Sequence, residues 1–203
     1  MSVSKAQRLL RLARAEPDRL TRHLLVAAAL RQVLHGDPIV VGGTAEEYWT
    51  AAEYHQTDLD LCLYLTPEDR ARLKALGFRR EGRHWAHPRI NVAVEFPDSR
   101  IDGDENRTTE EPVGDGAARI IGLDDLYLDR LRQATIEERS EGVEFKSALA
   151  VVAARFEDLD WRYVHRRIRE ITEKEGSVGA SMKRLDSRIR RRVRAKLSSN
   201  EEL

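Results

Sequence analysis

The sequence predicts an α/β fold in which a small mixed sheet lies between helices at the N-terminus and a helical bundle at the C-terminus. Residues 57–65 alternate strictly, with leucine at every second position, and residues 90–96 carry Ile, Val, Val and Phe at every second position, which is typical of strands with one buried face. Apolar residues at helical spacing precede and follow these segments. We divide the chain into an N-terminal helical lead (1–36), a sheet core (37–122) and a C-terminal helical region with a basic end (123–203).

The first two helices are expected at residues 5–15 and 17–35. Pro17 suits the first position of the second helix, and Asp18 then lies in its first turn, where a carboxylate interacts favourably with the helix dipole. Residues 36–38, Gly-Asp-Pro, are typical of a helix end.

A short buried strand, residues 39–41, leads into Gly42-Gly43 and then into a helix at 45–53. In the strand at 57–65, leucines alternate along one face and the acidic residues lie on the other. The alternation predicts that this strand has one buried face and one polar face.

A second helix–strand unit follows. A threonine–proline pair at 66–67 starts a helix that ends at Gly77, and residues 78–85 form a hairpin. Residues 90–96 form the second alternating strand, with Glu95 on its polar face.

The remainder is predicted to be a loop, a last strand and helices. Residues 97–116 are polar and predict a long loop, and residues 118–121 predict a short strand. Four helices then follow, at residues 123–134, 141–155, 160–174 and 179–197.

The composition is that of a globular protein with a highly charged surface, since 41% of the 203 residues are hydrophobic and 34% are charged. The longest apolar run, residues 24–30, is too short to cross a bilayer, and the N-terminus has no apolar core of a signal peptide. The single cysteine, Cys62, excludes an internal disulfide. We therefore expect a cytoplasmic protein that does not interact with membranes.

Charge is unevenly distributed, although the formal net charge is zero. Residues 37–111 hold 16 acidic and 9 basic side chains, whereas residues 162–196 hold 4 acidic and 13 basic ones. A basic segment of this kind favours a polyanion such as RNA or tRNA as a partner. A helix that docks on a protein and a solvated helix face are the alternatives. The basic end comprises Lys183, Arg184, Arg188, Arg190, Arg191, Arg192, Arg194 and Lys196.

Three carboxylates are predicted to meet on one side of the sheet. Asp58 and Asp60 share a strand face because they are two residues apart, and Glu95 joins them if the two alternating strands are neighbours. Acidic side chains beside a buried face are costly unless a cation neutralises them, and hard divalent cations take oxygen ligands. We predict a Mg²⁺ or Mn²⁺ site at these residues. The alternatives are that Asp98 is the third ligand, or that the aspartates are solvated edge-strand residues.

Gly42, Gly43 and Thr44 are predicted to bind phosphate. They follow a buried strand and open a helix, where glycines allow backbone N–H groups to approach an anion and the helix N-terminus favours negative charge. The Thr44 hydroxyl adds a further donor. Basic partners for these phosphates are expected among Arg79, Arg80 and Arg83.

Two histidines, His84 and His87, flank Trp85. Their spacing of three does not suit one face of a strand, so we interpret them as hairpin residues rather than as a metal pair.

The residues described above resemble the nucleotidyltransferase superfamily (polymerase beta-like). The family has an apolar residue, Gly-Gly or Gly-Ser, a spacer and then Asp-x-Asp between apolar residues. Here residues 41–44 are Val-Gly-Gly-Thr and residues 58–61 are Asp-Leu-Asp-Leu, with thirteen residues between the two motifs. The third acid of the family lies on a later strand, which matches Glu95, although that acid is often aspartate.

The amino-acid sequences of these motifs most closely resemble those of small prokaryotic members of the family, including the abortive-infection-type toxin nucleotidyltransferases. Residues 76–78, Leu-Gly-Phe, and a helix after the last strand, within residues 120–134, also recur in such proteins. The resemblance covers roughly residues 25–155 and implies a mixed sheet of nucleotidyltransferase topology.

The resemblance implies Mg²⁺-dependent transfer of a nucleotidyl group from a nucleoside triphosphate, such as ATP, to an acceptor. In that case Asp58 and Asp60 hold the metal, Glu95 completes the site and helps deprotonate the acceptor, and Gly42–Thr44 hold the triphosphate. The acceptor is RNA or tRNA, a protein hydroxyl or a small molecule, and the protein is a candidate component of a toxin–antitoxin pair.

Two other functions remain open on the sequence. One is an inactive module of the same fold that partners a toxin, an antitoxin or a nucleic acid. The other is a basic nucleic-acid-binding protein in which the acidic residues are incidental.

Overall fold

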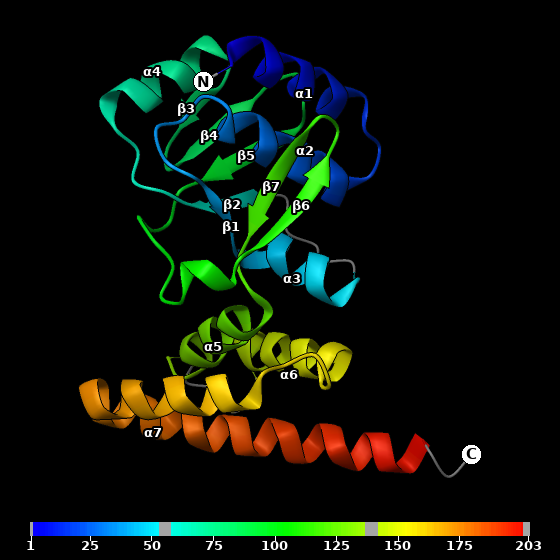
Figure 1. Ribbon diagram of the computed structural model, residues 1–203, viewed down its shortest axis with the longest axis vertical. Helices are drawn as coiled ribbons and strands as arrows, with labels where there is room; N and C mark the ends of the chain where they lie inside the picture. Colours follow the sequence, from blue (N-terminus) through cyan, green and yellow to red (C-terminus); the bar gives the residue numbers. More distant parts are fainter. Residues whose placement is uncertain (1, 53–57, 137–141, 201–203) are drawn as a thin grey trace. The chain divides into compact units, whose positions relative to one another are not determined.

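The computed structural model describes residues 2–52, 58–136 and 142–200, and the chain divides after Gly122 into two units. The described residues of the first unit form four helices, a 3₁₀ turn and a seven-stranded mixed sheet, whereas those of the second are helical (Figure 1). The α/β class expected from the sequence is therefore confirmed. Within the described residues, no helix is both long enough and apolar enough to cross a membrane.

Two helices, α1 (Val3–Ala15) and α2 (Arg19–Arg31), pack against each other in the first unit. Every residue of α2 from His23 to Leu30 is buried, so this helix lies deep in the core. It begins later than expected from the sequence. Asp18 is its N-cap and accepts a hydrogen bond from the Thr21 N–H, and Pro17 lies outside the helix. A side-chain cap decides where this helix starts because it satisfies an otherwise unpaired N–H.

Strand order in the sheet is β3-β4-β5-β2-β1-β7-β6. The β1 strand is parallel to β7 and antiparallel to β2, and β2 is in turn parallel to β5. The strands span Ile39–Val40 (β1), Asp58–Cys62 (β2), Arg79–Glu81 (β3), His84–His87 (β4), Val92–Glu95 (β5), Thr109–Val113 (β6) and Gly116–Ile120 (β7). Two shorter helices complete the unit, α3 (Gly42–Thr50) and α4 (Pro67–Ala75), with the 3₁₀ turn at Glu105–Arg107.

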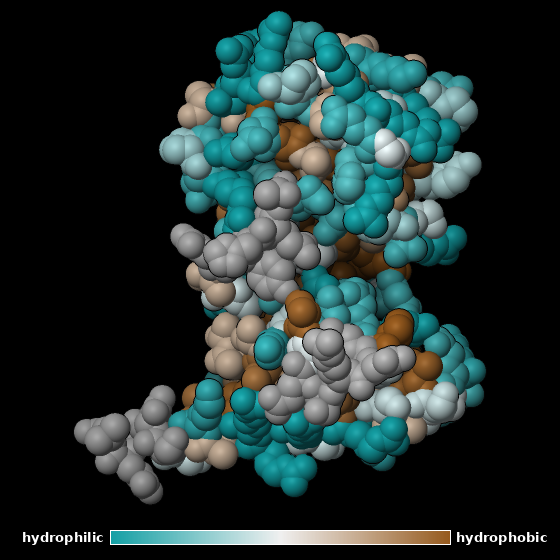
Figure 2. All heavy atoms as spheres, turned by 180° about the vertical axis from the view of Figure 1, so that it is seen from behind, coloured by the Kyte–Doolittle hydropathy of each residue, from teal (hydrophilic) through white to brown (hydrophobic). Residues whose placement is uncertain are grey.

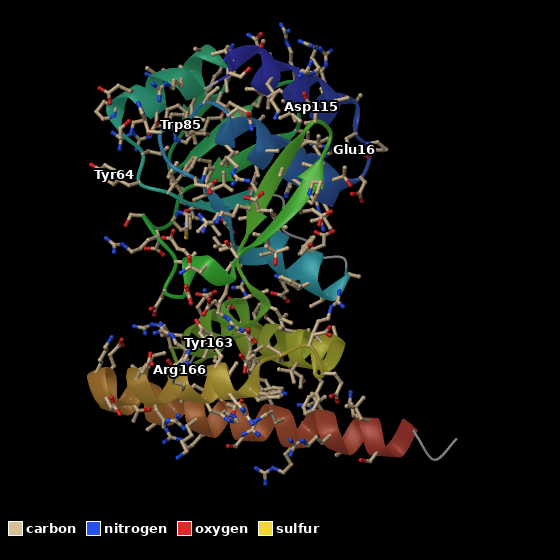
Figure 3. All side chains as sticks on the ribbon, viewed as in Figure 1. Glu16, Tyr64, Trp85, Asp115, Tyr163 and Arg166 are labelled. Atoms are coloured by element: carbon tan, nitrogen blue, oxygen red, sulfur yellow. The ribbon has the colours of Figure 1, made fainter. Side chains whose placement is uncertain are left out.

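The β6 strand was not expected, because the sequence predicts a loop over residues 97–116. Its residues alternate between half-buried and exposed, and it pairs with β7 alone at the edge of the sheet. An edge strand needs no apolar face and tolerates a proline such as Pro112. The β6–β7 turn carries Asp115, which forms an ion pair with Arg8 of α1 (Figure 3).

Apolar side chains fill the core of the sheet unit. Leu59, Leu61 and Val94 have no exposed surface, and Trp85 of β4 is also buried. Tyr64, just after β2, extends into solvent (Figure 3). Hydrophilic residues cover most of the face seen in Figure 2.

The second unit comprises α5 (Leu123–Ala134), α6 (Val143–Arg155) and α7 (Trp161–Asn200). The backbone of α7 leaves the helical conformation at Glu175 and Gly176, which lie between the two helices predicted there. The two halves fold back on each other as a helical hairpin (Figure 1), and a Cβ on Gly179 would lie 2.3 Å from the Thr172 hydroxyl oxygen. Two expected helix boundaries are wrong: α3 ends at Thr50, with Ala51 as its C-cap in the left-handed conformation, rather than at residue 53, and α6 begins at Val143 after Gly142 rather than at residue 141. The expected start of β2 at residue 57 lies outside the described residues.

Candidate active site

Carboxylates from two neighbouring strands lie on one face of the sheet. In the parallel ladder of β2 and β5, Asp58 is opposite Ala93 and Asp60 is opposite Glu95. Residues opposite each other in a ladder project to the same side, and alternation along β2 brings both aspartates to that side. The structure thus brings together Asp58, Asp60 and Glu95. Asp98 is exposed in the segment after β5.

His84 lies between two of these carboxylates. It is adjacent to Glu95 because the antiparallel register pairs Trp85 with Val94. Its Nε2 atom is 3.2 Å from Glu95 Oε2 and 3.4 Å from Asp58 Oδ2. Arg83 also reaches Glu95, with 3.2 Å between its Nε and Oε2. His84 is a hairpin residue, as expected, but the sequence pattern does not predict its place at the site.

The donor set fits a hard divalent cation. The three carboxylates supply oxygen ligands alone, and one atom of His84 already lies within 3.5 Å of oxygens from two different strands. In the part of the chain that the structure describes, no three His, Cys, Asp or Glu side chains are already arranged as metal ligands.

Gly42 connects the glycine turn to the carboxylates. It has a φ of +63°, and a Cβ added to it would lie 2.1 Å from Asp60 Oδ2. Any larger residue would meet both a strained backbone conformation and the carboxylate. The Val41 N–H donates to the Asp60 carbonyl at 3.0 Å, which fixes the turn to β2. The N-terminus of α3 therefore begins directly beside Asp60.

Thr44 lies in a different environment from the one expected. It is 3% exposed, and its hydroxyl is 2.8 Å from Nδ1 of His23, a residue of α2 that is 2% exposed. Gly43 is buried as well, whereas Gly42 is half-buried. The Thr44 hydroxyl thus joins α3 to α2 within the core, and Gly42 is the part of the turn nearest the surface.

Burial lowers the pKa of His23 to about 4, with the nearby charges of Arg19 and Arg22 acting in the same direction and Asp58 opposing them. An unfolded histidine titrates near 6.5, so the unfolded chain binds this proton first as the pH falls. The stability that neutral His23 contributes is fully present above the unfolded pKa and is lost as the pH falls from about 6.5 to about 4.

We expect the free energy of unfolding to fall by about 2 kcal/mol more between pH 7.5 and pH 5 in the wild type than in His23→Asn. Asparagine places an amide near the position of Nδ1 and does not titrate. Urea unfolding of both proteins at the two pH values measures this difference. Equal pH dependence in the two proteins would show that His23 is not the titrating group.

Of the three arginines expected to contact phosphate, Arg83 contacts Glu95, while Arg79 and Arg80 are exposed on the edge strand β3. Two arginines that no sequence motif predicts at the site, Arg19 and Arg22 of α2, line a cavity of about 470 Å³ together with Asp58. No local motif marks them, because only the tertiary fold brings α2 to the start of β2.

No family model matches the chain, and no curated protein sequence is significantly similar to it. Among solved structures, the chain is similar to an antigenic nucleotidyltransferase-like protein from Paracoccidioides brasiliensis. The similarity covers 83% of this chain and 94% of that chain, with a TM-score of 0.53 and 14% sequence identity.

The chain has a nucleotidyltransferase-like fold.

The basic end is part of the α7 hairpin. Met182, Ile189 and Val193 are buried, so an apolar stripe of this helix packs on its unit, whereas Leu197 is 41% exposed. The buried Asp186 accepts hydrogen bonds from Tyr127 and Arg190.

Three basic side chains of this segment cover aromatic rings of the second unit, although no aromatic residue lies within the segment itself. The guanidinium carbons of Arg188, Arg190 and Arg194 lie 4.7, 5.5 and 5.5 Å from the ring centroids of Phe145, Trp161 and Phe156, respectively. Arg166, in the first half of α7, covers Tyr163 in the same way (Figure 3). The exposed basic residues are Lys183, Arg184, Arg191, Arg192, Arg194 and Lys196.

Proposed function

We propose that this protein is a Mg²⁺-dependent nucleotidyltransferase that moves a nucleotidyl group from a nucleoside triphosphate to a hydroxyl acceptor. The observation that carries the proposal is the register that sets Asp60 beside Glu95, together with Gly42, where an added Cβ would lie 2.1 Å from Asp60 Oδ2. A carboxylate cluster next to a helix N-terminus combines a cation site with an anion site, which transfer from a triphosphate requires.

Asp58 and Asp60 would hold the divalent ion, and Glu95 would complete its ligands. When bound, such an ion neutralises charge on the phosphates and polarises the phosphorus–oxygen bonds. The backbone N–H groups at Gly42 and Gly43 would orient the triphosphate beside it. Thr44 would contribute by fixing the turn through His23 rather than by contacting phosphate.

The proposed transfer is a nucleophilic displacement at the α-phosphorus. The acceptor hydroxyl oxygen forms a bond to the α-phosphorus, the bond from that phosphorus to the bridging oxygen breaks, and pyrophosphate leaves. Glu95 would accept the hydroxyl proton, and Arg83, whose Nε lies 3.2 Å from Glu95 Oε2, would orient the carboxylate.

The fate of labelled phosphorus tests this function. The protein is incubated with Mg²⁺, a mixture of nucleoside triphosphates and three acceptors in separate reactions: total tRNA, the protein itself and an aminoglycoside. Nucleotidyl transfer moves an α-phosphate label to the acceptor, whereas phosphoryl transfer moves a γ-phosphate label. Transfer of the γ label alone would contradict the proposal. Binding of nucleotide without transfer of either label would identify an inactive binding module of this fold.

RNA, including tRNA, is the acceptor class that the basic end favours. The exposed lysines and arginines of α7 would neutralise phosphates, and each neutralised phosphate releases counterions, so that affinity falls steeply with salt. Met182, Ile189 and Val193 pack the same helix into its unit, so deletion of the segment would also remove part of the core. Substitution of the exposed charges is therefore the sharper test.

We expect replacement of Lys183, Arg184, Arg191 and Arg192 by glutamine to weaken tRNA binding at low salt and to reduce the slope of log affinity against log salt by about 3. The matched control keeps the charges, with lysine at the three arginine positions, and should retain the wild-type slope. Nucleotide binding should be unchanged in both. Fluorescence anisotropy with labelled tRNA across a salt series measures the slopes, and equal slopes for the glutamine variant and the wild type would remove RNA as a partner of this segment.

A further inference from the structure

A cavity of about 470 Å³ opens beside Asp58. Gly42, in contrast, lies next to Asp60, two residues further along β2. The volume of the cavity is in the range of small-molecule sites. We call this cavity the arginine pocket. Arg19, Arg22 and His23 of α2 form one wall, Asp58 belongs to the site face, and His87 and Asn91 come from β4 and the turn after it.

The wall of the arginine pocket that α2 supplies is positively charged. Both histidines at the pocket are held neutral near pH 7, because burial lowers the pKa of His23 and that of His87. The charges of Arg19 and Arg22 contribute at His23, and those of Arg89 and Arg14 at His87. The acidic residue that lines the pocket is Asp58, whose charge a bound divalent ion would offset.

Arg22 is fixed in place without being neutralised. Its Nε and Nη2 donate to the Glu16 carbonyl at 3.0 and 2.9 Å, and Nη2 also donates to the Pro17 carbonyl at 2.9 Å. Carbonyl groups carry no net charge, so these bonds position the guanidinium and leave its positive charge in the pocket wall.

Arg19 forms an ion pair with Glu47 through only one of its guanidinium nitrogens. Its Nη2 donates to Glu47 Oε2 at 2.9 Å, whereas its Nε is buried and has no hydrogen-bond partner among the residues that the structure describes. A buried guanidinium N–H without an acceptor is unfavourable unless a ligand supplies one. Guanidinium groups bind phosphate through several directed hydrogen bonds at once.

We propose that the arginine pocket binds a phosphate group of the acceptor, so that the acceptor is a phosphorylated hydroxyl compound such as a nucleotide or an RNA end. This deepens the proposed function and rests on it, because a phosphate held at Arg22 sets the rest of the acceptor beside Asp58. The pocket lies next to Asp58 and not next to Gly42, where the donor triphosphate would be held.

Isothermal titration of the full chain with inorganic phosphate, at low salt and without Mg²⁺ or nucleotide, tests the pocket. We expect Arg22→Gln to weaken phosphate binding by about tenfold, the loss of one charge-assisted contact. Arg19→Gln should weaken it as well while leaving the bonds from Arg22 to the α1–α2 connection in place. Arg100→Gln, which changes an exposed arginine in the segment after β5, is the matched control and should bind phosphate as the wild type does. Wild-type affinity in both pocket variants would overturn the proposal.

Nucleotide binding separates the two possible sources of the phosphate. If the phosphate belongs to the acceptor, Arg22→Gln leaves the thermal shift produced by Mg²⁺ and nucleoside triphosphate unchanged. If that shift is lost too, the pocket holds the donor triphosphate and the proposal is wrong.

Asp58→Asn distinguishes failure of the pocket from failure of the proposed function. It should abolish the Mg²⁺-dependent shift but tighten phosphate binding, by roughly threefold, because a repulsive charge is removed from the pocket. A wild-type protein that binds phosphate and no nucleotide would refute the proposed function alone. A protein that binds nucleotide and no phosphate would refute the arginine pocket alone.

Discussion

Asp58→Asn and Asp60→Asn should each abolish Mg²⁺-dependent binding of nucleoside triphosphate and reduce transfer by on the order of 10³-fold, equivalent to about 4 kcal/mol of transition-state stabilisation. The fold should remain as stable as that of the wild type or become slightly more stable. Each substitution removes one of several like charges on the site face, and so relieves repulsion in the metal-free protein.

Thermal melts with and without Mg²⁺ and nucleotide, together with the α-label transfer assay, measure both effects. Asp98→Asn is the matched control, because it removes an exposed carboxylate from the segment after β5 and should retain the ligand-induced shift. A wild-type shift in either site variant would count against the metal role of that aspartate. Loss of the shift in Asp98→Asn would instead make Asp98 a ligand.

Gly42→Ala should reduce transfer by on the order of 10²-fold and lower the free energy of unfolding by about 1–3 kcal/mol. The added Cβ would lie 2.1 Å from Asp60 Oδ2, so that either the turn or the carboxylate must move. Alanine is also strained at a φ of +63°. The expected loss of activity thus comes from displacement of a metal ligand and the loss of stability from both causes.

Gly82→Ala separates the two causes. Gly82 has nearly the same φ, +61°, but a Cβ there would meet nothing within 4 Å. It should lose stability through backbone strain and keep full transfer activity. Urea unfolding and steady-state kinetics of both variants measure the contrast. Equal activity of Gly42→Ala and Gly82→Ala would show that the contact with Asp60 does not matter to the reaction.

The parts of the fold that the sequence predicts well are those whose pattern is decided locally. Each of β2 and β5 has one wholly apolar face, so alternation alone identifies the strands and their polar sides. The β6 strand was missed because an edge strand with polar residues on both faces has no such pattern. The start of α2 was misplaced because Asp18 and Pro17 both suit helix starts, and the cap prevailed.

The residues of the candidate site also fall into those that a local pattern predicts and those that depend on how strands and helices pack. Asp58, Asp60 and Glu95 are visible in the sequence because an acidic residue opposite an apolar face is unusual. His84 was missed because its neighbours depend on the register between β4 and β5, which alternation within one strand does not specify.

The partner of Thr44 was missed because it lies on α2, 21 residues away in the chain. Nothing in the local sequence distinguishes a threonine that faces a ligand from one that bonds to a buried histidine. Tertiary packing alone decides between these environments.

The shortness of β1 has a consequence for the dynamics of the sheet. This strand contributes two residues, yet it joins β7 and β6 on one side to β2 and the other strands on the other. Few backbone hydrogen bonds cross this junction, among them those from Val41 N–H to the Asp60 carbonyl and from Ile121 N–H to the Val40 carbonyl. A narrow junction opens at a lower free energy than a long ladder, and here opening would separate Gly42 from Asp60. Any ligand that bridges these two residues would therefore stabilise the closed junction. Its binding would slow amide hydrogen exchange along β1.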